Sequence, residues 1–283
     1  MWEAVKMSKL ISANFLRLRK SKLFWACFVA MTAIGGIYVF SFYNDVIKYD
    51  ADVEFDDILF CFAFAVGFVS SVFCSLFIGT EYSDRTLHNK LIVGHSRTAI
   101  YFSGLLINIA ASVAVCLACV TVVCIFGIPM FGGLHMSSLR LWQLILGSFL
   151  LITAYCSVFT LVAMLCSNRA LSSVICILSV VVMFIAALQL YNRISAPEYY
   201  DEVVYSTDDG LMESEQIENP RYISGKIRVI YETAFDFLPT GQASQIAGMA
   251  EMSNPLRLSL FSFIVTVIFT ACGAAVFYRK DIK

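Results

Sequence analysis

Six long apolar runs constrain this chain more than any other feature of its sequence. Each has about the 20 residues that a helix needs to cross the hydrocarbon core of a bilayer. The runs cover residues 23–43, 58–79, 100–128, 143–166, 171–191 and 256–278. Backbone groups of an open chain would stay unpaired in lipid, and the alternating pattern of a barrel strand is absent, so every run is expected to be a helix. The predicted fold class is an all-α membrane protein with six transmembrane helices.

The composition agrees with a chain that lies mostly in lipid. Its mean hydropathy is +0.77, and 14% of its residues are charged, against about a quarter in soluble domains. The third run is long enough to tilt, or to break near residues 127–129. We expect four parts, namely a cytoplasmic amphipathic helix over 1–22, the first five spans over 23–191, an extracytoplasmic segment over 192–255, and the last span with a cytoplasmic tail over 256–283.

Lysine and arginine are distributed unequally between the two sides of the predicted helices. Thirteen of the 20 lie in the N-terminal segment, the 80–99 and 167–170 loops and the C-terminal tail. Cytoplasmic loops carry such an excess, so both termini are expected in the cytoplasm. The other side is acidic, because residues 44–57 hold six acids and one lysine, and residues 192–255 hold eleven acids and four basic residues.

The N-terminal segment has the periodicity of an amphipathic helix. Apolar residues recur every three or four positions, with most cations off their face, at Ala4, Met7, Ile11, Phe15 and Leu18. A helix on the inner membrane surface is the favoured interpretation, and a flexible basic leader is the alternative. The first apolar run follows a long charged segment and lacks a cleavage site of small residues, so we expect it to remain as an uncleaved anchor.

Small residues form a strip along one face of the second span. Ala63, Gly67, Ser71, Ser75 and Gly79 recur every fourth residue. Such strips let helix backbones approach closely in lipid, where van der Waals packing holds helices together. Packing within one chain and a seam between two chains both remain open.

The motifs of several enzyme classes are missing from the sequence. It has no phosphate-binding loop, no HExxH zinc helix and no nucleophile elbow. Its histidines, His88, His95 and His135, fall on both sides of the membrane, and the acid run at 50–57 lacks the glycine of a calcium loop, so a solvated acidic face explains it better. The ten cysteines all lie in spans as apolar fillers. We therefore expect no enzyme, no cofactor bound by this chain, and no nucleic acid partner.

Charged residues are absent from the interior of the spans, which disfavours transport coupled to buried carboxylates. Neutral polar residues remain at depth, and Thr266 is one of them. The candidates for a substrate path are Asn108, Thr153, Tyr155, Thr160 and Gln189. Hydrogen bonds between helices are the more ordinary explanation for each of them.

The segment 192–255 changes character along its length. Its middle is polar, acidic and turn-rich, and is expected to protrude as a small, partly mobile cap. From Ser224 on, aromatic and aliphatic residues mix with single charges. This pattern predicts short helices that lie at the outer leaflet or dip into it, with Pro239 and Gly241 breaking them. Asn254 and Pro255 mark the start of the last span.

The loop at 80–99 is a charged stretch between two apolar runs. Leu87 and Leu91 are four residues apart, and charged or polar residues surround them, among them Glu81, Asp84, Arg85, His88 and Lys90. This pattern predicts a short amphipathic helix that presents apolar side chains and a charged rim to a soluble partner. An ordinary solvated loop is the alternative.

Taken with the six spans, this loop resembles that of the permease subunits of ABC type-2 transporters. Members of that family tend to have an acid, a Gly-Thr-Leu-like turn, and Ser-Arg before the third span. Here the positions are Glu81, Thr86–Leu87 and Ser96–Arg97, with Arg85 where glycine is common and Ser103–Gly104 where a basic residue is common. The stretch FLPTGQASQ at 237–245 is also similar to the outer re-entrant region of lantibiotic- and bacitracin-resistance permeases, through Phe237, Pro239 and Gln242.

The resemblance implies a transport subunit in a bacterial plasma membrane. It implies a second permease copy or a relative, and two copies of a separate ATP-binding subunit that holds ATP and Mg. The residues that it assigns to ATPase coupling are Glu81, Arg85, Thr86, Leu87, His88, Lys90 and Leu91. Export of antimicrobial peptides, lipid-linked compounds or drugs is the expected function. A non-transporting membrane sensor with an outer ligand-binding segment is the alternative.

Overall fold

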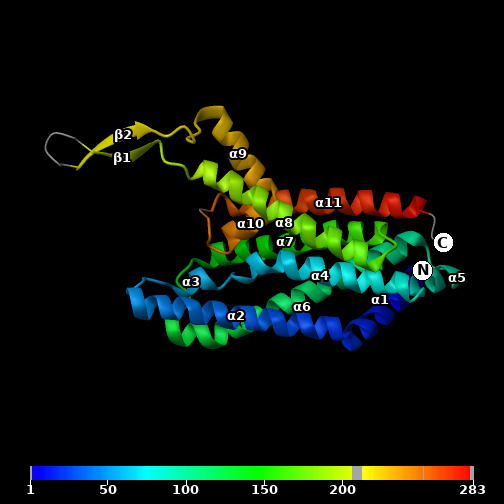
Figure 1. The fold of residues 1–283 in the computed structure, drawn as a ribbon. Helices are drawn as coiled ribbons and strands as arrows, with labels where there is room; N and C mark the ends of the chain where they lie inside the picture. Colours follow the sequence, from blue (N-terminus) through cyan, green and yellow to red (C-terminus); the bar gives the residue numbers. More distant parts are fainter. Residues whose placement is uncertain (1, 206–211, 251, 281–283) are drawn as a thin grey trace.

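The computed structural model of the protein describes residues 2–205, 212–250 and 252–280. Six of its helices are long and apolar enough to cross a membrane, which confirms the predicted number and order of spans. They lie side by side in a bundle, with both ends of the chain at the same end of it (Figure 1). The spanning helices are α2 (Lys22–Tyr49), α4 (Phe62–Ser83), α6 (Arg97–Phe131), α7 (Ser138–Leu165), α8 (Arg169–Ile194) and α11 (Pro255–Arg279).

Shorter elements lie at the two ends of the bundle. The N-terminal α1 (Trp2–Lys20) and the loop helix α5 (Thr86–Ile92) lie at the end that carries the termini (Figure 1). The other end carries α3 (Phe55–Ile58), a hairpin of β1 (Tyr199–Tyr205) and β2 (Met212–Glu218), α9 (Gly225–Phe237) and α10 (Pro239–Ile246).

Side-chain caps explain where several of the long helices begin. Ser21, Ser96, Ser137, Asn168 and Asn254 each precede a spanning helix, and each side chain accepts a hydrogen bond from a backbone N–H of the first turn. These caps satisfy donors that a helix start would otherwise leave unpaired. The six helices consequently extend a few residues beyond most of the apolar runs.

Of the two alternatives for the third run, a tilt or a break, the break near residues 127–129 is wrong, because helix α6 is continuous there. Pro129 lies inside the helix, which continues to Phe131 and ends at Gly132 with a φ of +87°. Gly127 instead serves packing, since a Cβ there would lie 3.0 Å from the Phe55 ring of α3. The long third span therefore remains one helix of 35 residues.

The small-residue strip of α4 packs within the chain. A Cβ at Gly67 would lie 2.9 Å from the ring of Tyr155 in α7, and one at Gly79 would lie 2.9 Å from the Arg169 side chain of α8. Ser71 and Ser75 are fully buried. The strip thus allows α7 and α8 to approach α4 closely, and α4 becomes the most enclosed of the spans.

The outer segment differs from the expected turn-rich cap. Its acidic middle forms an antiparallel hairpin that projects from the bundle, with Tyr199 opposite Glu218 (Figure 1). Tyrosine and valine are frequent in β1, and such residues favour strands. The short helices expected after Ser224 are present as α9 and α10. Gly241, however, breaks nothing, because it lies inside α10.

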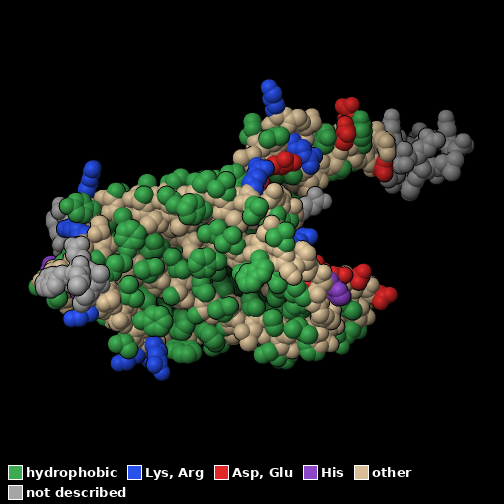
Figure 2. Space-filling view, turned by 180° about the vertical axis from the view of Figure 1, so that it is seen from behind, with side chains coloured by type: hydrophobic (Ala, Val, Ile, Leu, Met, Phe, Trp, Pro, Cys, Tyr) green, Lys and Arg blue, Asp and Glu red, His purple; other side chains and the backbone are tan. Residues whose placement is uncertain are grey.

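Charge divides the molecule as its sequence suggests. Lysine and arginine side chains gather around the end with the termini, and acidic side chains gather at the opposite end, with a few cations beside the hairpin (Figure 2). Apolar side chains cover the surface between these ends (Figure 2). This belt is the surface that a bilayer would cover.

Candidate functional site

A buried carboxylate, that of Glu81, organises the end of the bundle that carries the termini. Glu81 lies in the last turn of α4 and is 3% exposed. Its Oε1 accepts a hydrogen bond from the Nζ of Lys90 in α5 at 2.8 Å and forms a second ion pair with Arg17 of α1. Arg17 also donates to Thr80 Oγ1 at 2.7 Å and to the Phe77 carbonyl. One buried anion therefore has two cationic partners, which compensates the cost of its desolvation.

Asn14 extends this cluster from α1 to α6. It is 2% exposed and accepts a hydrogen bond from Lys90 Nζ at 3.0 Å. Its amide donates to Ser103 Oγ in α6 at 3.2 Å. Asn14, Arg17, Glu81, Lys90 and Ser103 together form the inner junction, which ties α1, α4, α5 and α6 to one another.

The predicted coupling residues surround this junction but do not all face outward. Thr86 Oγ1 donates to the Glu81 carbonyl at 3.2 Å, and Arg85 precedes α5 with a φ of +54°. His88 is exposed, whereas Leu91 is half-buried. The expectation that Leu87 contacts a partner is wrong in this structure, because its side chain is 1% exposed.

The apolar surface of α5 is formed by other residues. Ile92 and Val93, at the C-terminal end of the helix, are 71% and 72% exposed. Leu87 and Leu91 face the bundle, where Leu87 is buried and Leu91 is half-buried. Ile92 and Val93, which follow them, are exposed. The apolar pattern of the loop thus indicated a helix but not which of its faces is free.

The end of the chain forms a second contact at this end of the bundle. Lys280 Nζ donates to the Met164 carbonyl at 3.0 Å and to Tyr82 Oη at 3.1 Å. Arg97 donates to the Lys280 carbonyl. Partial burial lowers the pKa of the Lys280 ammonium. These contacts connect the end of α11 with the ends of α4, α6 and α7.

The residues proposed for a substrate path do not lie together around one cavity. Asn108 Nδ2 donates to Thr160 Oγ1 at 2.8 Å, and both side chains are fully buried between α6 and α7. Thr153 lies 3.2 Å from Thr266 Oγ1 of α11. Tyr155 packs against α4, and Gln189 is exposed on α8. None of these residues lines the cavities described below. Four of the five thus serve contacts between helices.

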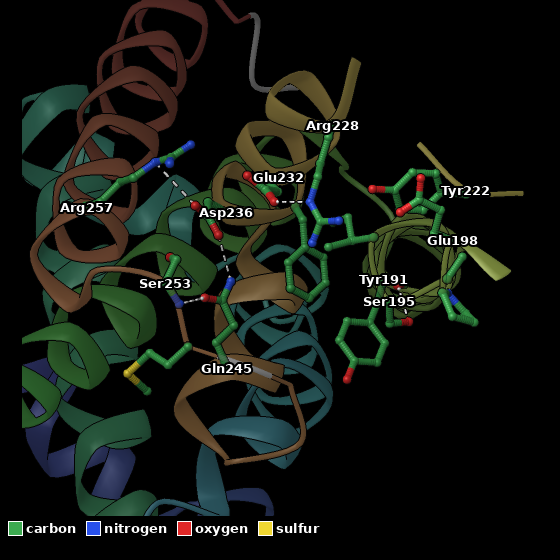
Figure 3. Close-up of a pocket in the computed structure, with 15 residues that line it drawn as sticks. Tyr191, Ser195, Glu198, Tyr222, Arg228, Glu232, Asp236, Gln245, Ser253 and Arg257 are labelled. Carbon is green, nitrogen blue, oxygen red and sulfur yellow. Dashed lines mark hydrogen bonds and ion pairs between the residues drawn. The ribbon is translucent and has the colours of Figure 1, made fainter. Parts of the chain in front are cut away.

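A second polar cluster lies at the opposite end, around α10 (Figure 3). Asp236, 2% exposed, accepts a hydrogen bond from Gln245 Nε2 at 2.8 Å, and its other oxygen lies 3.2 Å from Arg257 Nε. Gln242 Nε2 donates to the Asp236 carbonyl at 2.7 Å, and Gln242 Oε1 accepts a hydrogen bond from Ser262 Oγ of α11. These contacts join α9, α10 and α11.

The predicted re-entrant residues belong to the same region. Pro239 is the first residue of α10 and is buried, as is Gln242, whereas Phe237 is 41% exposed and packs edge-on to Phe261. Helix α10 packs against α4, α7 and α8, so it lies inside the bundle. A cleft of about 570 Å³ opens beside it, lined by Asp236 and Arg257 and by side chains that include Tyr191, Glu198, Tyr222 and Glu232 (Figure 3).

Comparison with known proteins places this architecture in a family. A family model described as ABC-2 family transporter protein matches residues 10–190, which is more than half of the 283 residues. The chain belongs to the ABC-2 transporter family. It is therefore a multi-pass membrane subunit of a transport system. No curated protein matches it significantly. The resemblance to type-2 permeases is confirmed, whereas the finer likeness to lantibiotic- and bacitracin-resistance permeases stays a prediction.

The ABC-2 match contains the whole inner junction, three members of which sequence reasoning missed. Arg17 was counted only as a cation of the N-terminal segment, and Ser103 only as a replacement for a basic residue. The only signal for Asn14 in the sequence is its spacing of four from Leu10 and Leu18, and the structure buries all three side chains, whereas Phe15 of the predicted apolar face is 54% exposed. A polar residue on the buried face of an amphipathic helix requires a partner, which here is Lys90.

Proposed function

We propose that this ABC-2 permease is the membrane subunit of an exporter that is driven by ATP hydrolysis on separate subunits. Two ATP-binding subunits, each holding ATP and Mg, would work with two permease copies or with this chain and a relative. The observation that carries the proposal is that the short helix α5, with an exposed apolar end, is joined to the spans through the buried carboxylate of Glu81.

The orientation follows from charge. Most lysines and arginines lie at the end with the termini, and positively charged loops stay in the cytoplasm. That end, which includes α1 and α5, would therefore face the ATP-binding subunits. The hairpin, α9 and α10 would face outward, in a plasma membrane that we expect to be bacterial.

The exposed end of α5 supports docking. Ile92 and Val93 form an exposed apolar pair one turn after His88, which is polar and exposed, and exposed Arg85 caps the other end of the helix. A central apolar contact with a polar rim is typical of protein interfaces. The inner junction supports transmission, since Lys90 of α5 binds Glu81 of α4 and Asn14 of α1. A force on α5 would therefore move α1, α4 and α6 together.

The outer end supports export of cationic or amphiphilic compounds. Its acidic loops attract positive charge, and antimicrobial peptides, lipid-linked compounds and drugs include many such molecules. The direction of transport is part of the proposal.

The test is ATP hydrolysis by the permease co-expressed with its ATP-binding subunit in lipid. We expect Ile92→Asp to lower permease-dependent hydrolysis at least tenfold, because losing one central apolar contact costs about 2 kcal/mol of binding. Leu139→Asp is the matched control, since Leu139 is equally exposed, at 70%, but lies at the opposite end. Its hydrolysis should equal that of the native protein.

Two results would contradict the proposal. If Ile92→Asp leaves ATP hydrolysis unchanged, the ATP-binding subunit does not dock on the exposed end of α5. Failure of any ATP-binding subunit to co-purify would favour the sensor, which needs no ATPase.

A further inference from the structure

Two cavities at the outer end of the bundle share one wall, the buried side chain of Phe60. The first, which we name the acid cleft, has a volume of about 480 Å³ and is lined by α3, the connection from α6 to α7, α7 and the region of α10. The second, the apolar groove, has a volume of about 300 Å³ and is lined mainly by α6 and α7. Phe60 lines both cavities, and it lies two residues after the end of α3.

The acid cleft carries an excess of negative charge. Glu54, Asp56 and Asp57 line it, against one arginine, Arg140. Two of these carboxylates accept only backbone N–H groups, since Asp56 binds the His135 N–H at 3.2 Å and Asp57 binds that of Glu54 at 3.2 Å. Among the residues that the structure describes, no ion pair engages any of the three acids. The cleft is therefore suited to a cationic group from outside the chain.

One hydroxyl group, that of Ser148, lies in the otherwise apolar lining of the groove. Ser148 of α7 is 4% exposed, and its hydroxyl has no hydrogen-bond partner in the described part of the chain. The other residues that line the groove are aliphatic or aromatic, apart from the thiol of Cys116. A buried hydroxyl without a partner costs free energy, and a ligand with a polar atom along its chain would remove that cost.

The groove also opens at the level of the lipid. Leu117 and Phe149 line it and are 59% and 47% exposed. Along α7 it extends from Leu141 to Ile152, a distance of about 16 Å at 1.5 Å per residue. This distance is about half of the hydrocarbon thickness, so a chain in the groove would lie in the outer half of the membrane.

We propose that the acid cleft and the apolar groove together bind a single-chain cationic amphiphile. Its head group would lie among Glu54, Asp56 and Asp57, and its chain, which carries an ether or ester oxygen for Ser148, would pass Phe60 into the groove. Charge complementarity selects this occupant over an anionic lipid, which the carboxylates repel, and over a neutral chain, which gains nothing from them. The inference rests on the proposed function, because it names the class of compound that the transporter would export.

The experiment is photo-crosslinking of the full chain, with its ATP-binding subunit, in phosphatidylcholine nanodiscs. The probe is a trimethylammonium whose single chain carries an ether oxygen and a diazirine, and the matched control is the same chain with a sulfate head group. We expect the cationic probe to label residues of α6 and α7 that line the groove. Glu54→Gln with Asp57→Asn removes two partly exposed charges, so it should lower labelling by the cationic probe about fivefold and should not lower labelling by the sulfate probe.

A second variant tests the groove itself. Val120 lines the groove from α6, and Val120→Phe would fill part of it and reduce labelling by the cationic probe. Leu106→Phe is the control, because Leu106 is a 45% exposed residue of the same helix that does not line the groove. Both variants should retain the elution volume of the native protein.

The outcomes separate this inference from the proposed function. Equal labelling by both probes, or crosslinks from the groove to a second copy of the chain, would overturn the inference even where hydrolysis depends on α5. Labelling that selects the cation, without hydrolysis that depends on α5, would support the site and contradict the transport proposal.

Discussion

Glu81 is the residue on which helices α1, α4 and α5 converge, and its contribution to stability depends on both of its cations. An isolated buried carboxylate would be very costly, and Arg17 and Lys90 are themselves mostly buried where they meet it. The pair Arg228 and Glu232 has a similar length, 2.9 Å, but both side chains are about 40% exposed. The chain therefore offers a buried and an exposed ion pair for comparison.

We predict that Glu81→Gln lowers the free energy of unfolding by about 3 kcal/mol, because it leaves two cations without an anion. Glu232→Gln should cost less than about 1 kcal/mol, as exposed pairs do. Thermal unfolding in the same detergent would compare the two variants. Equal shifts in Tm would show that the inner junction contributes no more than a surface pair.

Leu87 and Ile92 belong to the same helix but have opposite environments. Leu87→Asp would bury a carboxylate without a partner, so we expect loss of folded protein or a decrease of at least about 3 kcal/mol in the free energy of unfolding. Ile92→Asp should leave stability within about 0.5 kcal/mol. Size-exclusion chromatography with thermal unfolding measures both. A native-like Leu87→Asp protein would contradict the burial of that side chain.

At the scale of elements, the turn from α9 into α10 requires a residue without a side chain at Gly241. A Cβ on Gly241 would overlap the carbonyl oxygen of Phe235, which is backbone and has no rotamer to change. The close approach brings α10 against the end of α9 and places Gln242 and Gln245 beside Asp236. One glycine thus determines the position of the outer polar cluster.

Gly241→Ala should consequently destabilise the protein by about 3 kcal/mol, through overpacking that backbone shifts must relieve. Gly133→Ala is the matched control, since a Cβ there meets nothing within 4 Å. Thermal unfolding of both variants in lipid nanodiscs would measure the difference. If Gly241→Ala unfolds at the same temperature as the native protein, the close contact between Gly241 and the Phe235 carbonyl does not limit the packing of α10.

Elements and residues differ in how far the sequence alone predicts them. The six spans follow from apolar length, and the ends of several follow from Ser and Asn caps. The hairpin was missed because acidic residues interrupt its tyrosines and valines. The sequence of the loop alone does not indicate that Leu87 faces inward, since this depends on how α4 and α6 pack against α5. In the sequence, Glu54, Asp56 and Asp57 appear only as part of an acidic run, and the cleft that they line depends on residues far along the chain.

The whole molecule is polarised, and its orientation in the membrane is open to a direct test. Gly133→Cys and Asn89→Cys introduce exposed thiols at opposite ends, whereas the ten native cysteines lie in the bundle. In intact cells a membrane-impermeant maleimide should label Gly133→Cys at once and Asn89→Cys only after permeabilisation. The native protein supplies the background. The reverse pattern would place both termini outside.

The position of α4 has a consequence for the order of events during synthesis. It is the most enclosed span, with 78% of its most apolar stretch buried, against 22% for α2, α8 and α11. Yet α4 is the second of the six spanning helices to be synthesised. Helix α7, whose Tyr155 packs on Gly67, begins only at Ser138. After insertion, α4 therefore lacks the α7 contact on its small-residue face until more than half of the chain has been synthesised. A variant that delays α7 would leave this face open to the wrong neighbour.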